Sequence, residues 1–481
     1  MANLLATLFN SASALDAYDR VLEATQSNVA NSSTPGYARQ SLRMEALPFD
    51  PAHGLPGGVR AGEMQSSRDE YAELTVRSQT SQLGYEQQSA TVLTALQAIF
   101  DISGDVGIPH ALNRFYQSAA QWGQNPSSNA SRQTVIERAI DVARTFQSSA
   151  IALQNLTRDT ETQLTNTINQ VNRLVGQIGQ YNKVILQSLS GRRDMGVDAQ
   201  IHADLESLSE LIDFHAIKET DGTTTILLNG RVPLLQEDRQ FALSSEMAMP
   251  TDPPPVNTQG APWARLLASD KSDITAQTTD GQLGALLNLR NRVLPAFVGD
   301  AYQAGDLNRM AQQFADRVND ILTSGNISDG PPPVPGLPLF QYDAANPTIV
   351  ARSLTVDASL RPDQLSLIDP GPPYVGNGVP LALARLSVPT ADADRVDGIS
   401  YGEFYGGMAS RVGGWLQSAQ NGAQVQRSLV AQAKNQRQEL SGVDLNEEAL
   451  ILVEFQRAYQ ANSRIITVLD QLTQDTIDIL R

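Results

Sequence analysis

Cysteine is absent from this chain, and aromatic residues are scarce. The 481 residues contain no Cys, which excludes disulfides, catalysis by a thiol and metal sites built on thiolates. Only 6% of the residues are aromatic, whereas Gln, Asn, Ser, Thr and Ala are abundant. Since few large side chains are available to fill a deep core, we expect thin interfaces between helices.

Long apolar runs and basic clusters are also missing. No stretch of about 18 apolar residues occurs, so we expect no membrane span. The first ten residues lack the basic start and apolar core of a cleaved signal peptide, so an exported protein would keep its N-terminus. With 52 acidic and 35 basic residues the net charge is −17, which argues against nucleic-acid binding.

Both ends of the chain carry apolar residues at the alternating spacing of a coiled-coil seam. The N-terminal seam consists of Leu4, Leu8, Leu15, Tyr18, Leu22 and Val29. A predicted helix at 445–480 carries the C-terminal seam, Leu445, Leu452, Phe455, Tyr459, Asn462, Ile466, Leu469 and Leu480. Because polar residues interrupt both seams, neither helix should be stable alone, and we expect them to pair with each other and with neighbouring copies. Two unrelated surface helices on one core are the alternative.

The predicted N-terminal helix ends at a turn signal. Pro35 disfavours helix in the residue before it, and the pair Pro35-Gly36, followed by Tyr37, suits the centre of a type II turn. Asn28 and Asn31 lie three residues apart on one helix face, where their amides can bond across an interface. An ordinary helix stop is the alternative reading.

The middle of the chain is predicted to be helical with a small β insert. A long helix is expected at 128–190, and weaker helical patterns cover 68–100, 108–122, 200–213, 283–324 and 401–440. Three short strands at 214–246 are separated by Asp221-Gly222 and Asn229-Gly230, which are strong hairpin turns.

These patterns predict a mainly α, elongated protein. Residues 1–45 and 441–481 form the paired terminal helices, and 214–274 form the β insert. The helical bundle takes 46–213 and 275–440, with an irregular Pro-rich segment at 325–395.

Three short patterns resemble reactive or metal sites, and each has a plainer explanation. Gly398-Ile-Ser400-Tyr-Gly402 fits a nucleophile elbow, but no apolar strand precedes it and no His follows it. The acidic run 392–403 lacks the glycine that a calcium loop requires. Asp198, His202 and Asp204 lie close together in the sequence, but the group lacks the third strong ligand that a zinc site would need. We therefore expect no enzyme activity, no cofactor and no metal.

Two terminal blocks resemble the signatures of bacterial flagellar axial proteins, the rod, hook and hook-associated subunits. The first runs from Asn28-Val-Ala-Asn31 to Thr34-Pro-Gly-Tyr37. The second joins Leu440-Ser-Gly-Val-Asp-Leu-Asn-Glu-Glu448 to Phe455-Gln-Arg-Ala-Tyr-Gln-Ala-Asn462. The resemblance extends over nearly the whole chain. A helical middle with a small β insert is similar to hook-associated members, since rod and hook subunits have mostly β-structured middles.

Two regions depart from the hook-associated pattern. Residues 198–206 replace an Asp-Gln-Arg-Asp-like stretch, which puts any contact of that motif in doubt. The large outer β domain of many members is expected to be absent or vestigial, because only about 70 Pro-rich residues follow Ser324 before the next helical stretch.

The resemblance implies a structural subunit of the flagellum that joins hook to filament as an adaptor ring and is needed for filament assembly. Its implied partners are copies of itself, the hook protein on one side, and a second junction protein or the filament on the other. Export through the flagellar type III apparatus is implied, as is a cytoplasmic chaperone on the C-terminal helix at Leu452, Phe455, Tyr459, Ile466 and Leu469. A rod or hook subunit, or a secreted helical effector or adhesin, remains an alternative.

Overall fold

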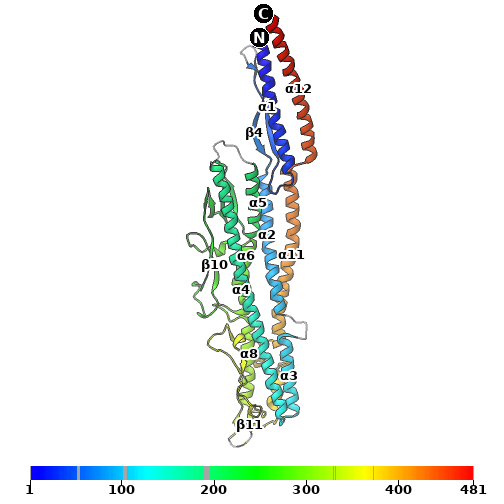
Figure 1. Ribbon diagram of the computed structural model, residues 1–481. Helices are drawn as coiled ribbons and strands as arrows, with labels where there is room; N and C mark the ends of the chain where they lie inside the picture. The colour runs from blue at the N-terminus through cyan, green and yellow to red at the C-terminus, as the bar shows by residue number, and fades with distance from the viewer. Residues whose placement is uncertain are drawn as a thin grey trace.

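The computed structural model describes residues 2–50, 55–100, 106–187, 195–328, 330, 332–371 and 373–479. The molecule is elongated, and the first and last helices lie side by side at one tip (Figure 1). Helices contain 63% of the residues and the strands form small antiparallel sheets, which confirms the predicted mainly α class. Within the described part of the chain, no helix is both long and apolar enough to cross a membrane.

Five of the described helices are longer than 29 residues. Their bounds are α1 (Ala2–Asn31), α2 (Glu70–Ile99), α3 (Gly107–Gln124), α4 (Asn129–Gln187), α5 (Met195–Leu211), α6 (Gly281–Asn288), α7 (Pro295–Val298), α8 (Asp306–Ser324), α9 (Val350–Ser353), α10 (Gly378–Arg385), α11 (Tyr401–Ser441) and α12 (Leu445–Ile479). The long helices predicted at 128–190, 401–440 and 445–480 are confirmed as α4, α11 and α12.

The narrow tip, here called the terminal segment, consists of α1, α12 and a hairpin that the sequence did not predict. The hairpin pairs β1 (Gln40–Ala46) with β4 (Val59–Ser66), with a bulge between Leu42 and Met44. Its turn region carries the short pair β2 (Phe49–Asp50) and β3 (Leu55–Pro56). Both long strands contact α1. The bundle was expected to start at residue 46, whereas here the chain returns along α1 before α2 begins at Glu70.

The bundle below the terminal segment is arranged around α4. Helices α2 and α11 run against each other along their length, and α3, α5 and α8 complete the bundle (Figure 1). Two separate apolar cores lie along α4. One core packs the first half of α4 with α3, α8 and α11 around Phe115, Phe314 and Tyr401. The other packs Val171, Ile178 and their neighbours against α5, α6 and the β insert.

The β insert is confirmed as an antiparallel meander. It consists of β5 (His215–Lys218), β6 (Thr224–Leu228), β7 (Val232–Gln236) and β8 (Arg239–Gln240), followed by a separate pair, β9 (Ser244–Ala248) with β10 (Trp263–Leu267). The predicted Asn229-Gly230 turn has φ of 46° and 66°, the left-handed pair that a two-residue hairpin loop needs.

The helical pattern predicted at 283–324 is interrupted in the structure. A π-helical turn covers Leu289–Val293 between α6 and α7, and the chain then leaves helix at Gly299, whose φ is 89°. In the described part of the irregular segment beyond α8, the elements are short and pack on the bundle. Its strands are β11 (Asn326–Ser328), β12 (Val334–Pro335), β13 (Phe340–Gln341) and β14 (Thr355–Val356).

Candidate functional site

Helices α1 and α12 contact each other along one side of each helix. The rings of Tyr18 and Phe455 meet edge to face, with centroids 5.7 Å apart. The Asn462 side-chain amide donates to the Ser11 carbonyl oxygen at 3.1 Å. Most predicted seam residues are half-buried, namely Leu8, Leu15, Tyr18, Leu22, Leu452, Phe455, Tyr459, Asn462, Ile466 and Leu469.

Two predicted seam residues lie outside this contact. Val29 is 41% exposed and Leu445 is 52% exposed, because the contact at the base of the pair passes to the polar residues Asn28 and Glu448. Leu480 lies outside the described residues. The backbone of Leu4 belongs to α1.

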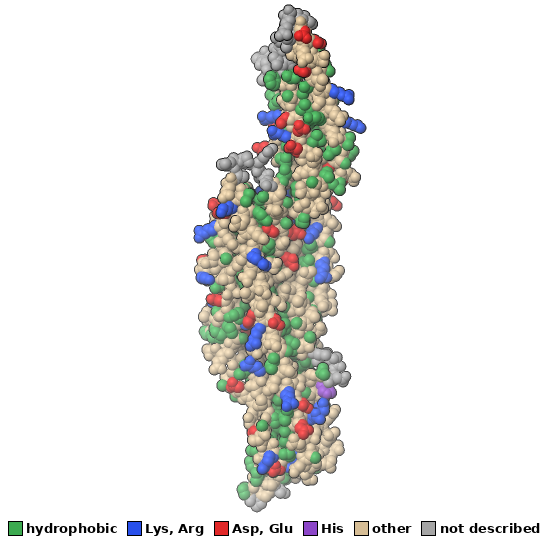
Figure 2. Space-filling model, viewed as in Figure 1, with side chains coloured by type: hydrophobic (Ala, Val, Ile, Leu, Met, Phe, Trp, Pro, Cys, Tyr) green, Lys and Arg blue, Asp and Glu red, His purple; other side chains and the backbone are tan. Residues whose placement is uncertain are grey.

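The apolar side chains of α12 are incompletely covered. Among its described residues none of the apolar side chains is fully buried. Leu450 is 72% exposed, and Val453, Ile465, Val468 and Leu472 are also exposed. Figure 2 shows hydrophobic side chains on the surface of the terminal segment. These five residues, here called the outward row, present an amphipathic helix with apolar groups on more than its α1 side.

A second stripe on α1 is fully buried, and sequence reasoning missed it. It consists of Ala14, Ala17, Val21, Ala24 and Asn28, at the same three- and four-residue spacing as the predicted seam. Contacts at both ends of this stripe place the β1–β4 hairpin beside it. At one end, a Cβ added to Gly58 would lie 3.0 Å from the Asn10 side-chain oxygen. At the other end, the Asn28 side chain donates to the Gln40 carbonyl oxygen of β1. The regular spacing of small residues could have indicated this buried stripe, because alanines allow a strand to approach a helix closely.

Asn28 is the polar centre at the base of the terminal segment. Its side-chain nitrogen donates to the Gln40 carbonyl oxygen at 2.8 Å and to Glu448 Oε2 at 3.1 Å. Its side-chain oxygen accepts from the Gln40 N–H and the Tyr37 hydroxyl, both at 2.9 Å. The amide thus uses both donors and both acceptor positions, and joins α1, β1 and α12. Asn31 instead donates to the Ser27 carbonyl oxygen within α1.

Glu448 is a buried carboxylate that Arg39 holds in place. Its side chain is 1% exposed, and Oε1 accepts from Arg39 Nε at 2.7 Å. Arg39 also reaches Glu447 at 2.9 Å, and its backbone N–H donates to the Ser441 carbonyl oxygen. A buried carboxylate needs such compensation, because an unpaired one is strongly destabilising.

The predicted turn at Pro35-Gly36 is confirmed. The Tyr37 N–H donates to the Thr34 carbonyl oxygen, and Gly36 has a φ of 74°, as position i+2 of a type II turn requires. Gly36 also lies directly against α5, where an added Cβ would be 2.2 Å from the Ala199 carbonyl oxygen. Glycine is therefore needed both for the turn and for the contact with the bundle.

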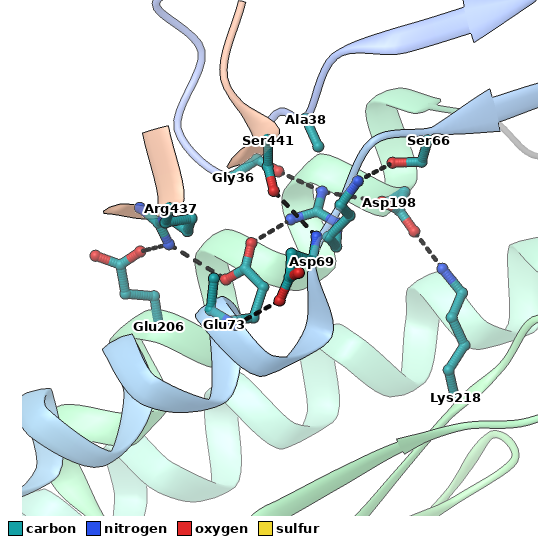
Figure 3. A network of polar contacts seen from close by, with 12 residues as sticks. Gly36, Ala38, Ser66, Asp69, Glu73, Asp198, Glu206, Lys218, Arg437 and Ser441 are labelled. Carbon is teal, nitrogen blue, oxygen red and sulfur yellow. Dashed lines mark hydrogen bonds and ion pairs between the residues drawn. The ribbon is translucent and has the colours of Figure 1, made fainter. Parts of the chain in front are cut away.

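Arg68 connects this turn to the bundle through Gly36, Glu73 and Asp198, which are labelled in Figure 3. One of its terminal nitrogens donates to the Gly36 carbonyl oxygen at 2.7 Å and to Asp198 at 3.0 Å, and the other donates to Glu73 at 2.6 Å. Lys218 from β5 pairs with the second Asp198 oxygen at 2.6 Å. Arg68 and Glu73 are each 5% exposed, so a buried ion network links three parts of the fold.

The network continues to α11. Arg437 pairs with Glu73 at 3.2 Å and with Glu206 at 2.7 Å, and Lys434 pairs with the other Glu206 oxygen. The Ser441 hydroxyl accepts from the Asp69 N–H at 3.0 Å (Figure 3). We call this region, from Gly36 and Arg68 to Arg437 and Ser441, the joint. It holds the terminal segment on the bundle.

Charges in the joint move the pKa of Asp198. Burial alone would raise that pKa, but Arg68, His202 and Lys218 outweigh burial and lower it to about 2. The carboxylate is therefore ionised at neutral pH and bridges two cations. The departure from the usual motif at 198–206 still leaves Asp198 in contact with Arg68.

Lowering the pH from 7 to 5 should destabilise the protein through His202. Burial, and then the positive charge of Arg68, lower the pKa of His202 from 6.5 to about 3. The unfolded imidazole binds a proton below pH 6.5 and the folded one does not, so this stability is complete above pH 6.5 and is lost as pH falls toward 3. At pH 5 the loss is about 2 kcal/mol.

Urea unfolding of wild type and His202→Gln at the two pH values measures this effect. The variant should show a smaller loss of stability than wild type between pH 7 and pH 5. His215→Gln changes an exposed imidazole and is the matched control. An equal loss in wild type and His202→Gln would contradict the assignment.

The patterns that resembled reactive sites have structural roles. Ser400 is the N-cap of α11: its hydroxyl accepts from the Glu403 N–H, and the Glu403 carboxylate accepts from the Ser400 N–H. Asp394 pairs with Arg317. Among the described residues, no group of three or more His, Asp or Glu side chains is positioned to hold a metal ion.

An open groove of about 770 Å³ beside α4 is lined by amide and arginine side chains.

Comparison with known proteins gives one family over most of the bundle. Residues 93–340 match the model of the flagellar hook-associated protein FlgK helical domain, and residues 434–479 match that of the flagellar basal body rod FlgEFG protein C-terminal region. Flagellar hook-associated protein 1 of Bacillus subtilis is 23% identical over 97% of this chain and 96% of the relative. Its namesake in Salmonella typhimurium is 21% identical over 99% and 100%.

Solved structures are similar over part of the chain. One of them is the flagellar hook junction protein FlgK from Burkholderia pseudomallei, with a TM-score of 0.46 and 22% identity. The match covers 56% of this chain and 47% of that chain, so about half of the solved protein is spanned.

Proposed function

Because the chain belongs to the family of flagellar hook-associated proteins that contain the FlgK helical domain, we propose that it joins the hook to the filament of the bacterial flagellum. It is a structural component of that organelle. The observation that supports the junction role most directly is the incomplete burial of α12, which is paired with α1 on one side and open on another. Copies arranged in a ring around the flagellar axis would cover the outward row.

The proposed division of the molecule follows from these contacts. The paired helices at 1–45 and 441–481 form the inner segment, 46–213 and 275–440 form the bundle with the irregular 325–395, and 214–274 form the insert. The β1–β4 hairpin packs on α1, so we extend the inner segment to about residue 66. In the assembly we place the hook protein on one side of the ring and a second junction protein or the filament on the other.

We further propose that the chain is exported through the flagellar type III apparatus, and that it catalyses no reaction. The first proposal rests on the family. The second rests on the roles of Ser400 and Asp394, which cap a helix and pair with an arginine.

Deletion of the gene from a motile parent strain tests the junction role. The strain should keep its hooks, lose its filaments and release flagellin into the medium. Normal filaments would contradict the proposal. Loss of the hooks would favour a rod or hook subunit, and unchanged motility together with binding to a host factor would favour an effector or adhesin.

Complementation of that strain tests the α1–α12 contact. Leu469→Asp should fail to restore filaments, because an unpaired carboxylate buried in the assembled seam costs several kcal/mol. Gln471→Asp places the same group on an exposed position of α12 and should restore them. Wild-type motility with Leu469→Asp would show that this face of α12 is not used in assembly.

Before export, we propose that a cytoplasmic chaperone covers the seam row of α12, namely Leu452, Phe455, Tyr459, Ile466 and Leu469. The row is about 25 Å long at helical rise and would be exposed whenever α1 is absent. In the folded chain it is half-buried on the α1 side, so a chaperone on this row would compete with α1. An amphipathic helix in a groove is an established way to cover such a row.

A pull-down of the small helical partner from cytoplasm tests this assignment. A chain ending at Gly442 should lose the partner, and Phe455→Ala with Ile466→Ala should weaken capture. Leu450→Ala with Val453→Ala, two exposed residues of the outward row, should leave capture unchanged. Retention of the partner by the truncated chain would place the site elsewhere.

A further inference from the structure

Arg77 of α2 is a buried cation that the joint leaves without a partner. It is 7% exposed, and its side chain makes no hydrogen bond or ion pair with the described residues. A guanidinium carries five N–H donors and stays charged in proteins. Burial penalises its charge and lowers the pKa of Arg77, whereas the charge of Glu73 opposes that shift, so a closer pairing with Glu73 would stabilise the guanidinium.

The nearest acidic groups on the same helix are Glu73 and Glu70, whose charges act on Arg77. Glu73 lies four residues before Arg77, so their side chains lie on one helix face within reach of an ion pair. In this structure both Glu73 oxygens are occupied, one by Arg68 at 2.6 Å and the other by Arg437 at 3.2 Å. Two arginines thus occupy the carboxylate that a third, Arg77, can reach.

The two arginines on Glu73 come from different parts of the molecule. Arg437 belongs to α11 and is also held by Glu206, so it stays with the bundle. Arg68 precedes α2 and holds the Gly36 carbonyl oxygen, so it ties Glu73 to the turn that follows α1 (Figure 3). Any tilt of the terminal segment that moves Gly36 away from α5 pulls on Arg68.

We propose that Glu73 exchanges Arg68 for Arg77, so that the joint has two ion-paired states. In the docked state, seen here, Arg68 binds Glu73 and Arg77 is unpaired. In the tilted state, Arg68 leaves both Glu73 and Asp198, Asp198 keeps Lys218, and Arg77 pairs with Glu73. The exchange keeps the buried carboxylate compensated in both states, since losing one partner without replacement is strongly destabilising. This proposal concerns the single chain and does not depend on its place in the flagellum.

Denaturant unfolding of four full-length proteins tests the exchange: wild type, Arg68→Met, Arg77→Met and the double variant. In wild type, Arg77→Met should raise the midpoint, because it removes an unpaired buried charge. In the Arg68→Met background the same change should lower the midpoint, because Arg77 is then the partner of Glu73. The unfolding constant should rise at least about tenfold in that background. A change of the same sign in both backgrounds overturns the proposal.

Distances between the two parts of the molecule give the second readout. The chain has no cysteine, so Gln180→Cys on α4 and Gln471→Cys on α12 provide two spin-label sites without background. Arg68→Met should add a second distance that disappears when Arg77 is also replaced. Arg427→Met, an exposed arginine of α11, should leave the distribution unchanged. A second distance that persists in the double variant, or none in Arg68→Met, overturns the proposal.

Discussion

Replacing Gly36 with alanine should detach the terminal segment from the bundle. The new Cβ would lie 2.2 Å from the Ala199 carbonyl oxygen and 2.8 Å from the Ala203 nitrogen, both of them backbone atoms of α5. Alanine also disfavours the φ of 74° that the turn uses. Together the strained backbone and the overlap should cost at least about 3 kcal/mol.

Limited proteolysis and denaturant unfolding measure this change. Cleavage between α1 and β1 should become faster in Gly36→Ala, while the circular dichroism of the bundle changes little. Gly402→Ala is the matched control, because a Cβ at that helical position meets nothing within 4 Å. Protection of residues 31–45 at the wild-type level would show that the turn does not need glycine.

Replacing Asn28 with aspartate should open the base of the terminal segment. The carboxylate keeps the size of the amide but loses both donated bonds, to the Gln40 carbonyl oxygen and to Glu448. It also places a second negative charge about 3 Å from the buried Glu448 carboxylate. Breaking a buried, compensated contact of this kind costs about 3 to 5 kcal/mol.

Asn31→Asp is the control for that substitution. Asn31 is three residues later on the same helix and half-buried; its amide donates to the Ser27 carbonyl oxygen and accepts from the Thr34 hydroxyl, so these bonds reach neither β1 nor α12. We expect Asn28→Asp to lower the denaturation midpoint and to expose 445–479 to protease, and Asn31→Asp to do neither. Equal effects of the two changes would show that the network around Glu448 contributes little.

The long helices could be predicted from sequence because their pattern is local. The row from Leu452 to Leu469 alternates at three and four residues, and those residues are half-buried in α12. The Pro35-Gly36 turn was equally local. The spacing failed as a guide at Leu445. This residue continues the spacing of seven, yet it is exposed, because Asn28 and Glu448 make the contact at that end of the pair.

The joint could not be predicted, because its contacts join residues far apart in the chain. Arg68 meets Asp198 across 130 residues, and Arg437 meets Glu73 across 364. Singly these are ordinary surface residue types, and no spacing relates them. The β1–β4 hairpin was missed for a related reason: its strands alternate weakly, and what fixes them is the alanine stripe of α1.

The position of the chain in an assembled flagellum tests the junction role most directly. Thr258→Cys, on an exposed loop of the β insert, gives a single site for a gold label in a chain without cysteine. In a motile strain that carries this variant, electron microscopy should show the label as one band at the end of the hook where the filament begins. Label spread along the hook or filament, or over the cell surface, would contradict the junction role.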